Sequence, residues 1–195
     1  MCYAVYIATN QKLEEKYFDS KKEDIRISKI DETIKTVLGS KFSKKNIYYL
    51  GSDGNSCSCG FAFASQDIFL PEEAEENKKA PIKLIKLLKE LTLIENVEYY
   101  CCWEGDQKKD VKFHRAINIQ TITMDNYFGL VEQEFIDFIR TFKPKIRENL
   151  ILILEREEKG AVLKAIKSLK KQAKTTLIDA RKYVEYLAIE LKKVK

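Results

Sequence analysis

Short apolar runs with alternating polar positions recur along the first two thirds of the chain. Residues 2–9 (CYAVYIAT) are rich in β-branched and aromatic side chains, and residues 46–64 hold two similar runs on either side of the turn residues SDGN. Residues 46–52 and 57–64 should therefore form a β-hairpin. In all, the pattern predicts strands near residues 2–9, 46–52, 57–64, 97–103 and 113–123.

Other segments place apolar residues at helical spacing. After Pro81, the stretch IKLIKLLKELTLI repeats leucine and isoleucine every three or four positions, which predicts a helix that begins at this proline. Residues 31–42 predict a shorter helix with an aspartate N-cap, and residues 130–142 predict another. From Glu155 to the C-terminus we expect two helices with a break near residues 173–176.

Together these elements predict an α+β fold, in which a mainly antiparallel sheet with flanking helices is followed by a helical C-terminal subdomain. Pro144 indicates a boundary between residues 1–142 and residues 143–195. With 195 residues, 45% of them hydrophobic, the chain is long enough to bury a sizeable core. A disordered protein is therefore not expected.

The sequence carries no pattern of membrane targeting. Residues 1–10 lack a basic stretch followed by an apolar one, and no apolar run approaches the roughly 20 residues that cross a bilayer. The five cysteines are an odd number, and their spacing is unlike that of a secreted disulfide framework. We expect a cytoplasmic protein with reduced thiols and no membrane partner.

The stretch SCSCGFAFAS, residues 56–65, raises the question of whether its thiols form a site. In a strand, Cys57 and Cys59 share one face with Phe61 and Phe63, which favours core positions for both thiols. The alternative is a zinc site, since zinc is held by closely spaced cysteines at about 2.3 Å. Residues two apart in a regular strand are separated by about 6.6 Å, so chelation by Cys57 and Cys59 requires a bend in the chain.

A second candidate site combines a thiol with the single histidine of the chain. If strands 97–103 and 113–119 form a hairpin, Cys102 and His114 lie opposite each other, on the face turned away from the apolar residues. A protonated histidine lowers the pKa of a neighbouring thiol and makes it a nucleophile. The alternative is a half-exposed pair of residues on a solvated sheet face.

Two strand ends add further candidates. Removal of Met1 would make Cys2 an N-terminal nucleophile with its own α-amine as the base, whereas retention of Met1 leaves Cys2 as a small strand residue. At another strand end, Trp103 and the acidic segment 104–106 are candidates for the wall of a ligand pocket, although a tryptophan is more often a core anchor.

Positive charge gathers towards the C-terminus. The net charge of the chain is +5, and residues 159–195 hold eleven Lys or Arg against three Asp or Glu. Such a stripe suits non-specific, salt-sensitive binding of nucleic acid, or binding of a protein partner, through residues 160–195; a solvated helix face is the alternative. The last helix should pack on the one before it or form a homodimer. The stripe on one side of the expected helix consists of Lys164, Lys167, Lys171 and Lys174.

Three segments together resemble an uncharacterised bacterial protein family. They are MC at the start of the first strand, FSKKNIYYLGSDGNSCSCGF at residues 42–61 and YYCCWEGD at residues 99–106. The resemblance covers residues 1–140 and implies a bacterial cytosolic protein. It implies no activity, cofactor or catalytic residue.

Two hypotheses of function follow. The first is a small intracellular protein with a pocket lined by Cys and His, which acts through a thiolate or through a bound metal such as zinc. The second is a non-enzymatic module that binds nucleic acid or a protein through the basic C-terminal helices. At this point both an enzyme and a binding module stay open.

Overall fold

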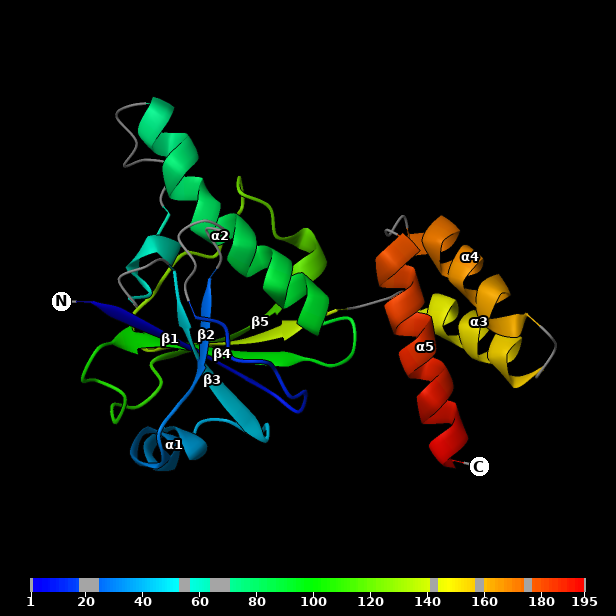
Figure 1. The fold of residues 1–195 in the computed structure, drawn as a ribbon, viewed down its shortest axis with the longest axis horizontal. Helices are drawn as coiled ribbons and strands as arrows, with labels where there is room; N and C mark the ends of the chain where they lie inside the picture. The colour runs from blue at the N-terminus through cyan, green and yellow to red at the C-terminus, as the bar shows by residue number, and fades with distance from the viewer. Residues whose placement is uncertain are drawn as a thin grey trace. The chain divides into compact units, whose positions relative to one another are not determined.

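The structure, a computed structural model, divides the chain into two compact units, Met1–Ile139 and Arg140–Lys195 (Figure 1). Each unit has hydrophobic core clusters of its own. The residues that the structure describes are 2–17, 25–52, 57–63, 71–140, 144–156, 160–173 and 177–194.

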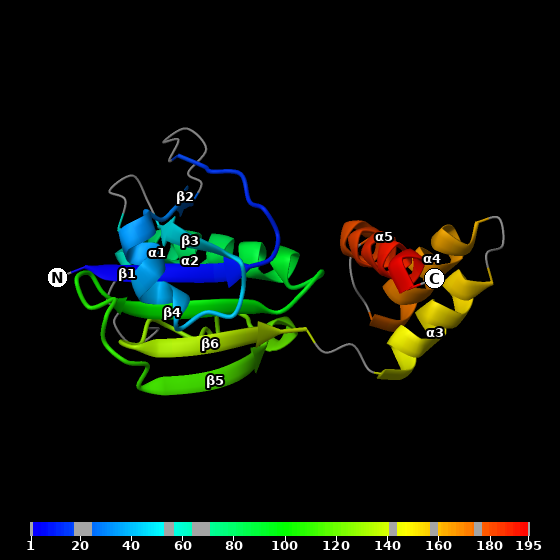
Figure 2. The ribbon, with the colours of Figure 1, turned by 90° about the horizontal axis from the view of Figure 1, so that it is seen from below.

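The N-terminal unit is built on one six-stranded sheet with the strand order β2-β3-β1-β4-β6-β5 (Figure 2). Neighbouring strands are antiparallel, except that β5 and β6 are parallel. The mainly antiparallel sheet of an α+β fold, as predicted from the sequence, is therefore present. The strands are β1 (Tyr3–Thr9), β2 (Arg26–Lys29), β3 (Asn46–Gly51), β4 (Val97–Trp103), β5 (Phe113–Asn118) and β6 (Glu134–Ile139).

Helices lie on both faces of this sheet. α2 (Pro71–Leu91) runs along one face, and α1 (Glu32–Gly39) lies against the other (Figure 1). α1 has the expected N-cap, because the Asp31 carboxylate accepts a hydrogen bond from the backbone N–H of Ile34 at 2.8 Å. α2 differs from the expectation, since Pro81 lies inside it rather than at its start. Most of the preceding residues EENKKA are good helix formers, and the ion pairs Lys78–Glu75 and Lys79–Glu76 stabilise the turn before the proline.

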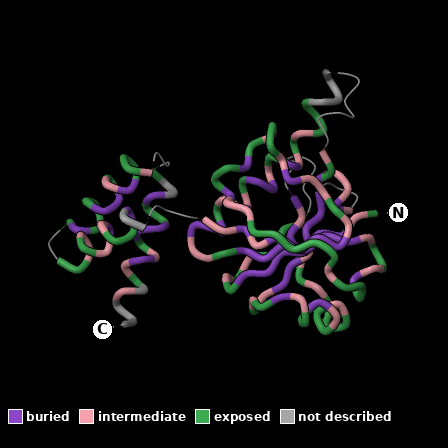
Figure 3. The backbone as a smooth tube through the Cα atoms, turned by 180° about the vertical axis from the view of Figure 1, so that it is seen from behind, coloured by how far each residue is buried: buried purple, intermediate pink, exposed green. Residues whose placement is uncertain are grey.

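Alternate residues of β1 pack into two separate hydrophobic cores, one on each face of the sheet. Val5 packs in the cluster that contains Leu84 of α2, whereas Tyr6 packs in the cluster that contains Leu38 of α1. Figure 3 shows buried residues gathered along the central strands. Burying one large apolar side chain contributes about 1.5–3 kcal/mol, so these central strands provide much of the stability of the unit.

The helix expected at residues 130–142 is wrong, because Glu134–Ile139 form β6 in the sheet. Six residues with the sequence EFIDFI fit a helical period and an alternating one almost equally well. β6 lies between β4 and β5, and Phe135, Ile136 and Phe138 are all buried. Burial on both faces favours a central strand, which the local pattern alone does not reveal.

The strand expected at residues 57–64 is also wrong. The chain forms a 3-10 turn, η1 (Cys59–Phe61), directly after Ser58. Ser58 is fully buried; its Oγ accepts a hydrogen bond from the Val5 N–H at 2.9 Å and donates one to the Leu50 carbonyl at 2.6 Å. Ser58 thus bridges β1 and β3, and because both strands already have a neighbour on each side, residues 57–63 have no free strand edge there to pair with. The turn expected between the two strands falls largely on residues 53–56, outside the described residues.

The strand expected at residues 113–123 is shorter than predicted. β5 ends at Asn118, and a second 3-10 turn, η2 (Ile119–Thr121), follows it. The Asn118 side chain accepts a hydrogen bond from the Gln120 N–H at 3.2 Å, which caps this turn and ends the strand.

The C-terminal unit contains three helices, α3 (Pro144–Glu155), α4 (Ala161–Ala173) and α5 (Leu177–Val194). The run LILIL belongs to α3, and α5 packs on the other two helices in a shared core. None of the helices within the described ranges combines the length and the apolar character that a membrane crossing requires. The fully buried residues of this core are Leu150, Ala165, Leu169, Ala180 and Val184.

Candidate metal centre

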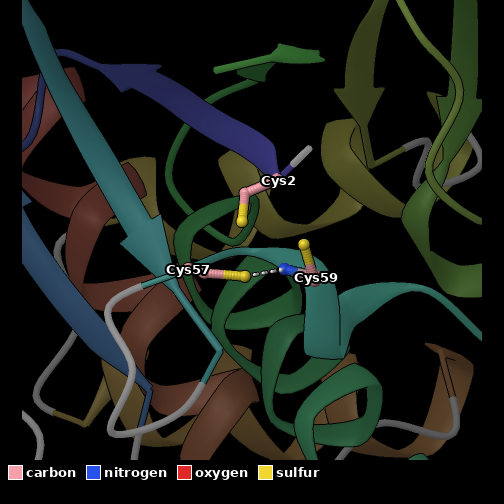
Figure 4. Close-up of side chains that lie close together, drawn as sticks. All are labelled: Cys2, Cys57 and Cys59. Carbon is pink, nitrogen blue, oxygen red and sulfur yellow. Dashed lines mark hydrogen bonds between the residues drawn. The ribbon is translucent and has the colours of Figure 1, made fainter.

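Three cysteine thiols converge at the end of the sheet where β1 begins and β3 ends. Cys2 immediately precedes β1, while Cys57 and Cys59 flank Ser58. Their sulfur atoms all lie within 4.8 Å of one another. Figure 4 shows the three side chains pointing towards a common centre. Two candidates that are far apart in the sequence, Cys2 and the pair Cys57 and Cys59, therefore belong to one cluster, which we call the three-cysteine cluster.

Hydrogen bonds to Ser52 bend the loop that carries Cys57 and Cys59. The Cys57 carbonyl accepts hydrogen bonds from the Ser52 N–H and from its hydroxyl, both at 2.8 Å. The Gly60 N–H donates to Ser52 Oγ at 2.9 Å, and a Cβ at Gly60 would lie only 2.7 Å from this oxygen. With Ser58 fixed between β1 and β3, these contacts supply the bend that two cysteines in a strand lack.

β4 holds Cys2 in place from the other side. The Glu104 N–H donates to the Cys2 carbonyl at 2.8 Å. The next residue, Tyr3, pairs with Trp103 across the strands, and their rings stack with centroids 4.0 Å apart. Sheet pairing therefore fixes the backbone of Cys2, which places its thiol beside the loop that carries Cys57 and Cys59.

Backbone N–H groups point at two of the three sulfurs. The Cys59 N–H donates to Cys57 Sγ at 3.0 Å, drawn as a dashed line in Figure 4. The Tyr3 N–H donates to Cys59 Sγ at 3.2 Å. Donors of this kind stabilise a thiolate relative to a thiol, and they are a common feature around metal-bound sulfur.

In the absence of a cation the Cys57 thiol favours its protonated form. Burial, followed by the hydrogen bond with the Cys59 thiol, raises the pKa of Cys57 to about 12, while the Cys59 N–H acts in the opposite direction. Three negative sulfurs within 4.8 Å of one another also repel each other. A bound cation would remove this repulsion, and the thiols would release protons on binding it.

The spacing of the sulfurs fits a thiophilic ion. Zn²⁺ holds thiolates at about 2.3 Å in a tetrahedral arrangement, which places any two sulfurs about 3.8 Å apart. The sulfurs of the three-cysteine cluster, within 4.8 Å, reach this spacing through small side-chain rotations. In the part of the chain that the structure describes, no fourth Cys, His, Asp or Glu completes the set.

A cavity of about 440 Å³ lies beside the cluster, on the face of the sheet that α1 covers. Its volume is in the range of pockets that hold small molecules, about 300–1,000 Å³. Of the candidate pocket wall marked by the sequence, Trp103 and residues 104–106, only Glu104 is among the residues that line this cavity, and Trp103 instead stacks on Tyr3. The wall also includes Cys2, Cys57, Tyr6, Tyr49 and the segment from Ser28 to Asp31.

The hairpin that would join Cys102 to His114 is wrong, because β6 lies between β4 and β5. Cys102 is fully buried in the core on the α1 face, and burial raises its pKa to about 12. His114 pairs with Phe135 of β6, and its Nε2 lies 2.8 Å from Asp137 Oδ2. The structure thus gives His114 a carboxylate partner, and the strand register that a Cys102 nucleophile requires is not formed.

The lysine stripe of the C-terminal unit lies on α4. Lys164, Lys167 and Lys171 are exposed, and Leu169 is buried on the other side of the helix. Lys174 lies outside the described residues. Binding of nucleic acid or a protein partner by this surface stays a prediction.

Sequence reasoning missed the residues that assemble the cluster. The roles of Ser52 and Ser58 depend on hydrogen bonds to distant strands, and Tyr6 and Tyr49 reach the cavity only through the pairing of β1 with β3. One local signal was available, since the small residues of CSCG permit a tight turn more readily than a strand. No family model, no curated protein and no solved structure matches this chain, so its likeness to a bacterial family stays a prediction.

Proposed function

We propose that the N-terminal unit binds one thiophilic metal ion, with Zn²⁺ as the first candidate, through Cys2, Cys57 and Cys59. The observation that carries this proposal is the convergence of three sulfurs within 4.8 Å from two distant parts of the chain. Soft thiolate ligands favour ions such as Zn²⁺ and Cu⁺ over Mg²⁺ and Ca²⁺, which prefer oxygen.

At Cys57, metal binding is better supported than the role of a free thiolate nucleophile. A nucleophilic cysteine needs a lowered pKa, whereas burial raises that of Cys57 to about 12. The N–H groups that point at Cys57 Sγ and Cys59 Sγ support a charged sulfur once a cation balances it.

A bound ion also ties the start of β1 to the loop around η1. Since the ligands come from both segments, the ion favours the folded chain over the unfolded one. At a free ion concentration of 1,000 times the Kd, this linkage adds about 4 kcal/mol to the free energy of unfolding.

The test is a titration of the reduced, metal-free protein with Zn²⁺ in competition with a chromophoric chelator. We expect one ion per chain. Each of the variants Cys2→Ser, Cys57→Ser and Cys59→Ser should weaken binding by more than about 100-fold, since loss of a direct ligand exceeds the roughly 10- to 100-fold effect of outer residues. Cys102→Ala, in the buried core on the α1 face, is the matched control and should bind as the parent does.

Two results would contradict this proposal. One is equal Zn²⁺ affinity in the parent and in the variant that lacks all three cysteines. The other is a reduced parent protein that binds no Zn²⁺ or Cu⁺ while circular dichroism shows it to be folded.

The second candidate function is binding of nucleic acid by the C-terminal unit. The exposure of Lys164, Lys167 and Lys171 on α4 favours it, since a lysine stripe neutralises phosphates without reading sequence. Random duplex DNA should then bind more weakly as salt rises, and Lys167→Glu with Lys171→Glu should reduce both affinity and salt dependence. Association that is absent at low salt would rule this candidate out.

A further inference from the structure

The three-cysteine cluster supplies three ligands, and the cavity lies directly beside two of them. Cys2 and Cys57 line the cavity, whereas Cys59 does not; its sulfur lies at the Tyr3 N–H. An ion held by three sulfurs in a tetrahedral arrangement keeps one further position. With Cys2 and Cys57 both at the cavity wall, that position would open towards the cavity.

The arrangement differs from that of a closed structural site. Structural zinc sites have four protein ligands, whereas sites that bind exogenous molecules keep three and leave one position open. Within the described ranges, no fourth residue brings a ligand atom as close to the three sulfurs as they are to one another. Glu104 lines the cavity but stands outside this set.

The charges around the cavity favour one class of ligand. Three thiolates and a divalent ion carry one net negative charge, and Glu104 and Asp31 add two more at the wall. The positive charge of Lys29 is paired with Glu15, at 2.7 Å between Nζ and Oε1. Arg26 acts on Tyr49 electrostatically but does not line the cavity. Lys29 also lines the cavity, and with its charge counted the wall and the ion together stay net negative, which disfavours an anion.

Resting on the proposed metal site, we infer that the cavity is a binding site for a small neutral or cationic molecule that coordinates the bound ion through a nitrogen or sulfur donor. Tyr6 and Tyr49 add aromatic residues to the cavity lining, and Ile34 of α1 also lines it. The ion and the cavity thus form one site, in which the ion fixes the donor atom and the cavity selects the rest of the molecule.

The experiment uses the full-length protein loaded with Co²⁺, whose visible absorption bands report the ligands of the ion. Imidazole is titrated as the neutral nitrogen donor at about pH 8, where most of it is uncharged, and azide as the anion. We expect imidazole to change the bands saturably, at a concentration at least about tenfold lower than azide, because the charges at the wall disfavour the anion.

Cavity variants show whether the added donor enters by this route. Ile34→Trp, and the milder Ile34→Phe, should weaken imidazole binding by about tenfold or more while the Co²⁺ affinity stays within about threefold of the parent value. Glu104→Gln should leave the bands of the imidazole-free protein unchanged and bring the azide affinity closer to that of imidazole. Glu90→Gln, on α2 at the other face of the sheet, is the matched control and should have no effect.

Three outcomes would overturn the inference. Bands that stay unchanged at saturating imidazole indicate a closed fourth position, and changed bands in imidazole-free Glu104→Gln identify Glu104 as the fourth ligand. An imidazole affinity that is equal in the parent and both Ile34 variants indicates entry by another route. A protein that takes up no Co²⁺, Zn²⁺ or Cu⁺ instead disproves the metal site itself, so the two failures are distinguishable.

Discussion

Two groups of cysteines in the N-terminal unit acquire opposite properties from the backbone that carries them. Cys101 and Cys102 are adjacent in β4, but they point to opposite faces of the sheet and are fully buried in two separate cores. Cys2 and Cys57 are distant in the sequence, yet their sulfurs lie together, partly accessible, beside a cavity. Adjacent positions in a strand thus place the thiols of Cys101 and Cys102 on opposite faces of the sheet. Strand pairing and a bent loop bring Cys2 and Cys57 together.

The largest expected difference between the two groups is in their reaction rates. In the reduced, metal-free protein, a maleimide should label Cys2 and Cys59 directly, since neither is buried. Cys101 and Cys102 should react at least about 10³-fold more slowly, because they become accessible only when the chain opens. Peptide mass spectrometry over a time course measures both rates. Labelling of Cys101 at the rate of Cys2 would show that the two groups do not differ.

Serine substitutions should separate the two groups by stability. Cys102→Ser places a hydroxyl among buried apolar residues and should lower the free energy of unfolding by about 1–3 kcal/mol. Cys57→Ser in the metal-free protein should change it by less than about 0.5 kcal/mol, since this side chain is only partly buried. Urea unfolding followed through Trp103, the single tryptophan, measures both. Equal costs at the two positions would contradict this difference.

The strands that the sequence predicts well are those that carry their own pattern. β1 and β4 consist almost wholly of apolar and β-branched or aromatic residues, and their observed bounds lie within one residue of the expected ones. The segment of β6 fits two periods, so its place between β4 and β5 depends on pairing with distant strands. The expected pairing of Cys102 with His114 is wrong for the same reason. It assumed that β4 and β5, which are consecutive in the sequence, also pair in the sheet.

The candidate site also depends on contacts between distant segments, which the local sequence does not reveal. The sequence indicates that Cys57 and Cys59 need a bend before they can share an ion, and η1 with Ser58 supplies that bend. It does not indicate that Cys2 joins them, because that contact requires the order β3-β1-β4 and the loop anchored by Ser52. Local chemistry therefore indicated Cys57 and Cys59 as candidate metal ligands and Cys2 only as a candidate nucleophile, and tertiary pairing placed the three sulfurs together.

A glycine substitution tests whether the bend assembles the cluster. Gly60→Ala would place a Cβ 2.7 Å from Ser52 Oγ, so this hydroxyl must move away from the Cys57 carbonyl. We expect Zn²⁺ affinity to fall by about tenfold, as for other residues that orient ligands. Gly39→Ala is the matched control, because a Cβ there meets no atom within 4 Å. Parent-like Zn²⁺ affinity in Gly60→Ala would show that the anchor at Ser52 is not required.

The smallest expected effect is the pH dependence of stability in the metal-free protein. Burial raises the pKa of Cys102 to about 12, whereas a thiol in the unfolded chain titrates near about 8.5. The unfolded state therefore loses this proton first as pH rises, so the contribution to stability is complete below about pH 8.5 and declines above it. Between about pH 7.5 and 9.5 the decline from this thiol should be about 1 kcal/mol.

The variant Cys102→Ala removes this titration and should reduce the loss of unfolding free energy between the two pH values. Comparing each variant with itself at the two pH values cancels the packing cost of the substitution, and urea unfolding with a chelator and a reductant present measures it. Cys57→Ala should reduce the loss by less, because its thiol is only partly buried and solvent screens its titration. A larger change for Cys57→Ala than for Cys102→Ala would mean that the cluster, and not β4, holds the more deeply buried thiol.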